Sequence, residues 1–95
     1  MLNSKQRAYL RSLSNGIDAI FQIGKSGTNE NMIRQISDAL EARELIKLRT
    51  LDTCPLSPAE AAELIAKETG AEAVSVVGSK FVLYRESKNK KKIEL

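Results

Sequence analysis

Apolar residues recur every three to four positions in three stretches of the chain, which is the spacing of helices with one buried face. The first stretch follows a cap at Asn3 or Ser4 and ends at Asn15-Gly16, and the second follows a cap at Thr28 or Asn29. The third begins at Ser57-Pro58-Ala59-Glu60, where a capping serine, an early proline and a glutamate favour a helix start, and it ends at Gly70. In the first helix, the residues predicted to face the core are Leu2, Gln6, Tyr9, Leu10 and Leu13.

Four short apolar runs predict strands at 17–23, 45–51, 73–77 and 80–85. Gly78-Ser79 separates the last two and fits a type II′ hairpin turn, which needs glycine first. In the second strand the alternation is mixed, with Lys47 and Arg49 pointing to one face and Ile46 and Leu48 to the other. The order α-β-α-β-α-β-β predicts one compact domain of the α/β (α+β) class, with three helices on a mixed four-stranded sheet.

Gly24-Lys25-Ser26-Gly27 joins the first strand to the second helix. Two glycines allow another backbone to approach closely, and the free N–H groups of the following helix favour an anion, as does the charge of Lys25. KH domains hold a nucleic-acid backbone with such a Gly-x-x-Gly loop, although a tight surface turn would need the same glycines. The sequence therefore makes this loop the leading candidate for a phosphate contact.

Charge is distributed unevenly along the chain, whose formal net charge is +3. Residues 1–27 hold four cations and one carboxylate, whereas residues 52–85 hold three cations and five carboxylates. Arg7 and Arg11 are predicted to be exposed opposite the apolar face of the first helix, with Lys5 off that stripe. Four lysines follow residue 87, in a tail predicted to fray. This polarity suits a nucleic-acid surface with an acidic back.

Several classes of function lack the residues they need. The chain has no histidine and one cysteine, Cys54, which removes an internal disulfide, a thiol–imidazole pair and a Cys/His zinc set. A nucleotide-binding P-loop would need glycine at position 19, where Ala19 stands. We therefore expect no catalysis, metal, cofactor or small-molecule substrate. With no signal peptide and no membrane-length apolar run, we expect a soluble, cytoplasmic protein. We also expect it to be a monomer.

Five separated blocks of the chain resemble the CRM domain (chloroplast RNA splicing and ribosome maturation) in its short bacterial, YhbY-like form. They are residues 5–13, 23–27, 39–40 with 44–47, 68–71 and 83–85. The resemblance implies an RNA-binding domain over residues 1–87, followed by a basic tail at 88–95. It also implies association with precursor large ribosomal subunits and their rRNA, as an assembly factor. The residues expected to contact RNA are Gly24, Lys25, Ser26, Gly27, Arg7, Arg11, Lys5 and Lys47.

Other interpretations stay open at this point. The acidic third helix, with Glu60, Glu63 and Glu68, also fits an adaptor that docks on a ribosomal protein without holding RNA. Contact of Arg49 and the tail lysines with RNA is undecided. Tyr9 and Tyr84 could stack on bases, but both lie in apolar patterns that favour packing in the core.

Overall fold

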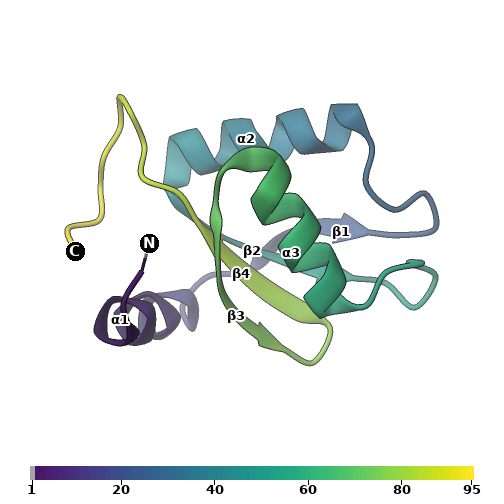
Figure 1. Ribbon diagram of the computed structural model, residues 1–95, viewed down its shortest axis with the longest axis horizontal. Helices are drawn as coiled ribbons and strands as arrows, with labels where there is room; N and C mark the ends of the chain where they lie inside the picture. The colour runs from purple at the N-terminus through teal and green to yellow at the C-terminus, as the bar shows by residue number, and fades with distance from the viewer. Residues whose placement is uncertain (1) are drawn as a thin grey trace.

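The computed structural model describes residues 2–95 and contains the seven predicted elements in the predicted order (Figure 1). The α+β class is confirmed, and each element lies within two residues of its expected bounds. The elements are α1 (Ser4–Ser14), β1 (Ala19–Ile23), α2 (Glu30–Arg43), β2 (Leu45–Thr50), α3 (Pro58–Thr69), β3 (Glu72–Val77) and β4 (Lys80–Tyr84).

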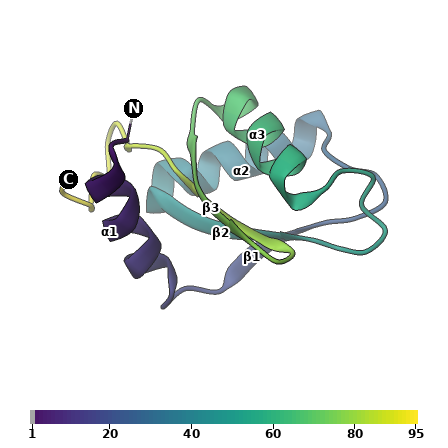
Figure 2. The same cartoon turned by 60° about the horizontal axis from the view of Figure 1, so that its bottom comes forward.

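The four strands form one mixed sheet in the order β1-β2-β4-β3. β1 and β2 are parallel and are connected through α2, while β4 is antiparallel to both of its neighbours. α2 and α3 cover one face of the sheet, and α1 lies against one end of the other face (Figure 2). The sheet therefore has one covered face and one face that is only partly covered.

The predicted helix starts and the hairpin turn are confirmed in detail. The side chain of Asn29 accepts a hydrogen bond from the Met32 amide at 2.8 Å, and Ser57 and Glu60 form a reciprocal capping box at the start of α3. Gly78 has a φ of +60° and Ser79 does not have a positive φ, as a type II′ turn requires. Local sequence alone determines these junctions.

Two hydrophobic clusters lie on opposite faces of the sheet. The larger one joins the sheet to α2 and α3, and it includes Ile36, Leu48, Ile65 and Phe81. The smaller one lies under α1 and contains Leu10, Leu45, Val74, Val82 and Tyr84. Tyr84 therefore packs in the core, as expected, whereas no helix within residues 2–95 covers the rest of the face beside α1.

α1 is rotated relative to the prediction. Its buried residues are Leu10 and Ser14, while Tyr9 and Leu13 are 49% and 38% exposed, so the inward placement of Tyr9 was wrong. Arg7 lies on the inner side and is half-buried, which corrects its predicted exposure. Its guanidinium donates to the carbonyl oxygens of Ala73 and Val74, where the register of β3 shifts and the ladder is interrupted. The side of α1 that faces the sheet therefore includes a donor for the carbonyl groups at the β3 bulge.

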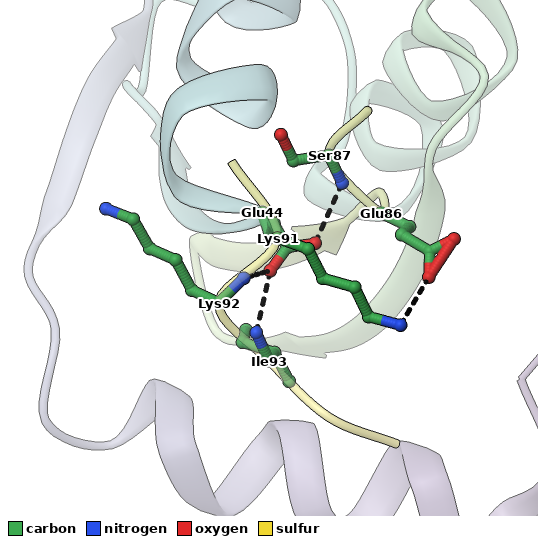
Figure 3. A network of polar contacts seen from close by, with 6 residues as sticks. All are labelled: Glu44, Glu86, Ser87, Lys91, Lys92 and Ile93. Carbon is green, nitrogen blue, oxygen red and sulfur yellow. Dashed lines mark hydrogen bonds and ion pairs between the residues drawn. The ribbon is translucent and has the colours of Figure 1, made fainter. Parts of the chain in front are cut away.

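The C-terminal segment is held in place, contrary to the expected fraying. The side chain of Glu44 is fully buried, and one of its oxygens accepts the amide of Ser87 at 2.8 Å. Its other oxygen accepts the amides of Lys92 and Ile93 at 2.6 and 2.8 Å (Figure 3). The two carboxylate oxygens of Glu44 at the end of α2 therefore accept the backbone amides of a segment that forms no strand or helix of its own.

Glu44 carries two further signs of a specialised position. Its φ is +66°, in the left-handed region that non-glycine residues rarely adopt. Burial alone would raise the pKa of its carboxyl, but the backbone donors at Ser87, Lys92 and Ile93, with the charge of Lys91, hold that pKa below its usual 4.5. The buried group is thus an anion stabilised by the tail.

Candidate nucleic-acid interface

The Gly24–Gly27 segment is a hydrogen-bonded turn at the end of β1. The Gly27 amide donates to the Gly24 carbonyl at 2.9 Å, which places Lys25 and Ser26 at the two corners, both exposed. Gly27 itself is buried and has a φ of +65°, with its missing Cβ 3.5 Å from the ring of Pro55. The geometry therefore fixes the ends of the turn and directs its two polar side chains outward.

The loop between β2 and α3 supports this turn. The Leu51 amide donates to the Ile23 carbonyl at 2.8 Å, and the Cys54 amide closes a second turn on the Leu51 carbonyl at 2.9 Å. A Cβ on Gly24 would lie 3.4 Å from Leu51 Cδ1, which is ordinary contact, and Gly24 does not have a positive φ. The fold thus requires glycine at 27 far more than at 24. The loop that follows β1 and the loop that follows β2 lie together at the end of the molecule away from the termini (Figures 1 and 2).

The start of α2 contributes less to anion binding than the sequence suggested. The helix begins at Glu30, and the Asn29 side chain already accepts the Met32 amide. Glu30 also places an exposed carboxylate in the first turn, where it satisfies the helix dipole itself. The charge available for a phosphate is therefore that of Lys25.

The other predicted contacts lie on a different part of the molecule. Arg11 and Lys5 are exposed on α1, at the end of the sheet remote from the turn, and the guanidinium of Arg7 is engaged with β3 (Figure 2). Lys47 is half-buried on the partly covered sheet face, where it lines the same depression as Arg11. The structure thus brings Arg11 and Lys47 together but separates them from the turn.

Lys80 is a cation at this face that the sequence analysis missed. It begins β4 and lines the depression together with Lys47 and Arg11. The hairpin at Gly78-Ser79 and the alternation along β4 were visible in the sequence. The pairing of β2 with β4, which places Lys80 beside these residues, depends on strand order and is not a local property.

Other kinds of site find little support within residues 2–95. There, no three Cys, Asp or Glu side chains are grouped to hold a metal ion, and no helix is long and apolar enough to cross a membrane. Cys54 is half-buried and packs against the larger cluster. The turn and the partly exposed cations are therefore the features of this part of the chain that are placed to contact a ligand.

The family model for the CRS1 / YhbY (CRM) domain matches residues 2–85. "Probable RNA-binding protein YqeI" of Bacillus subtilis is 47% identical over 95 residues, covering 100% of this chain and 99% of its own. An "RNA-binding protein" of Haemophilus influenzae is 30% identical over 90 residues, covering 95% and 91%. The solution structure of the hypothetical Staphylococcus aureus protein SAV1595, described as a candidate RNA-binding protein, has a TM-score of 0.83 and 56% identity, covering 100% and 99%.

Proposed function

Because the chain belongs to the CRS1 / YhbY (CRM) domain family, we propose that it binds RNA through the Gly24–Gly27 turn. In finer terms, we propose that its RNA is ribosomal and that it assists assembly of the large ribosomal subunit. The observation that carries the proposal is the turn itself, which exposes Lys25 and Ser26 at its corners and is braced by the loop at 51–55. A rigid turn loses little freedom when it contacts a phosphate, so more of the contact energy contributes to binding.

Recognition of the RNA backbone suits this surface better than base stacking. Phe81 and Tyr84 are buried, and Phe21 packs against the larger cluster. Tyr9 is the remaining aromatic residue and is exposed on α1, remote from the turn. Without an aromatic platform near Lys25, contacts to phosphate and RNA shape would position the partner.

The test compares affinities for structured rRNA fragments across a salt series. The variant Lys25→Asp/Ser26→Asp reverses the charge of the turn, and Lys67→Asp/Gln35→Glu makes the same charge change on exposed positions of α3 and α2. If the proposal is correct, only the turn variant loses affinity, and its plot of log affinity against log salt flattens by about 0.7–0.9 per lost phosphate contact. Wild-type affinity in the turn variant would overturn the proposal.

A second experiment addresses the ribosomal part of the proposal and its rival. Tagged protein is sedimented with precursor and mature large subunits, with and without the turn variant. Enrichment on the precursor that the turn variant abolishes supports the assembly role. Glu63 and Glu68 are exposed on α3; if their replacement by Gln releases the particle and the turn variant does not, the protein is an adaptor for a basic ribosomal protein.

A further inference from the structure

A depression of about 180 Å³ lies on the partly covered sheet face, between the end of α1 and the β3–β4 hairpin. Three cations line it from three separate elements: Arg11 of α1, Lys47 of β2 and Lys80 of β4. Lys47 pairs with Val82 across the sheet, so Lys80 is the diagonal neighbour of Lys47, and diagonal residues of an antiparallel pair are about 7–8 Å apart. Asn15 and Ser75 add polar groups to the lining, and none of the lining residues is a carboxylate. We call this feature the sheet depression.

The cations around the sheet depression repel one another within the folded chain. Arg49 lies directly opposite Lys80 in the β2–β4 ladder, and like charges in that position are unfavourable. Within residues 2–95, no ion pair joins Arg11, Lys47, Arg49 or Lys80 to a carboxylate. The Nε of Arg49 is also buried without a hydrogen-bond partner. Within the described residues, none of these four neighbouring cations therefore has a salt-bridge partner, although Asp18 lines an adjoining depression together with Lys47.

The end of α1 does not repel an anion from the sheet depression as strongly as a bare helix terminus would. The last carbonyl groups of a helix carry partial negative charge. Here the Arg11 carbonyl accepts the Ser14 hydroxyl at 2.7 Å, and the carbonyls of Ser12, Leu13 and Ser14 accept backbone amides at 3.2–3.3 Å. The cations are thus the dominant electrostatic feature of the lining.

We propose that the sheet depression binds a phosphodiester group of the same RNA, as a second contact point besides the Gly24–Gly27 turn. This inference rests on the proposed function, because it takes RNA as the ligand. Arg49 and Lys80 lie at the end of the sheet where the turn leaves β1, and Arg11 lies on α1. An RNA backbone crossing the face from Lys25 towards Arg11 would therefore meet cations along its path. The ligand chemistry is the phosphate backbone, since the lining contains no aromatic side chain for a base.

The test uses Arg11→Gln/Lys80→Gln, because both side chains are exposed and neither makes a contact that the fold needs. Lys67→Gln/Lys88→Gln removes the same charge from exposed positions on α3 and the C-terminal segment. Affinity for an rRNA fragment is measured across a salt series for both variants, the wild type and Lys25→Asp/Ser26→Asp. We expect the sheet-depression variant to lose on the order of tenfold in affinity and to flatten the salt slope by about 0.7–0.9, as the loss of one phosphate contact predicts.

Each other outcome has a definite meaning. If only the turn variant loses affinity, the sheet depression is not a site and the proposed function stands. If only the sheet-depression variant loses affinity, the second site is supported and the turn proposal fails; if neither does, both fail. An equal loss in the Lys67→Gln/Lys88→Gln control overturns the inference in favour of general charge attraction. A loss that depends on base sequence and leaves the salt slope unchanged overturns the assignment to phosphate.

Discussion

Replacing Glu44 with Gln keeps the shape of the side chain but removes the charge that holds the C-terminal segment. In the wild type, one carboxylate oxygen accepts two amides, from Lys92 and Ile93, and the other accepts the amide of Ser87. A glutamine has one acceptor oxygen and one NH₂ group. If the glutamine oxygen accepts the amides of Lys92 and Ile93, its NH₂ group faces the Ser87 amide. Both of those groups are donors, so no hydrogen bond forms between them. The substitution therefore removes one hydrogen bond and weakens two.

The size of the effect follows from the difference between charged and neutral hydrogen bonds. A bond to a charged group contributes about 1.5–3 kcal/mol and a neutral one about 0.5–1.5 kcal/mol, so the gross loss for Glu44→Gln is roughly 4–6 kcal/mol. Glutamine also avoids the cost of burying a charge, which offsets part of this loss. We expect a net loss of about 2 kcal/mol in the free energy of unfolding, or roughly 8–16 °C in Tm for a domain of this size.

The stability difference between the wild type and Glu44→Gln should depend on pH. The folded-state pKa of Glu44 lies below its usual 4.5, so the ionised carboxylate stabilises the folded chain at pH values above 4.5. That contribution is lost as the pH falls through the folded-state pKa, because the protonated wild type then resembles the glutamine variant. The stability difference between the two proteins should therefore be full at pH 7 and shrink towards zero in acid.

The assay is urea unfolding followed by circular dichroism from pH 7 down to pH 3. Glu86→Gln is the matched control, because Glu86 is exposed and pairs with Lys91 at 3.0 Å at the surface, where such a pair contributes little. Amide hydrogen exchange gives a second readout, with faster exchange expected at Ser87 and Ile93 in Glu44→Gln only. Equal stability at pH 7, or a difference that persists unchanged at pH 3, would refute the reasoning.

Four further substitutions test the contacts of Arg7, the Gly24–Gly27 turn and the pair of Arg49 and Lys80. Arg7→Met should lower the free energy of unfolding by about 1–3 kcal/mol, since the carbonyls at the β3 bulge lose their donor; unchanged urea unfolding would contradict this. Gly27→Ala should cost about 1–2 kcal/mol because of its φ of +65°, whereas Gly24→Ala should cost less than ~0.5 kcal/mol, and thermal unfolding that ranks them the other way would be inconsistent with the turn geometry. Lys80→Gln should raise stability by about 0.2–1 kcal/mol by relieving its repulsion with Arg49, and a lower stability in urea would count against that repulsion.

The parts of the fold that could be predicted from the sequence are those set by neighbouring residues. Ser57-Pro58 with Glu60 specifies a helix start through contacts within four residues, and Gly78 specifies a hairpin turn through its own φ. The exposed turn at Lys25 was predictable for the same reason. Each of these junctions satisfies its backbone groups locally, so no knowledge of the rest of the chain is needed.

The features that escaped prediction depend on partners far along the chain. The apolar pattern of α1 favoured Tyr9 as an inward residue. In the structure Arg7 lies inward instead and donates to a carbonyl group at the bulge in β3. Nothing near Glu44 in the sequence indicates a buried anion, because its three donors come from the tail. Lys80 became part of a candidate site only through the pairing of β2 with β4. In each case the missing information was a contact between elements.

The burial of Glu44 also makes the order of synthesis relevant to folding. Its carboxylate is translated 43 to 49 residues before the amides that satisfy it, and those amides follow β4 in the chain. At about 5–20 residues per second, the donors at Ser87, Lys92 and Ile93 are made within about two seconds of the end of β4, and until then this anion is not compensated. The charge at the end of α2 is therefore compensated only after all four strands of the sheet have been made.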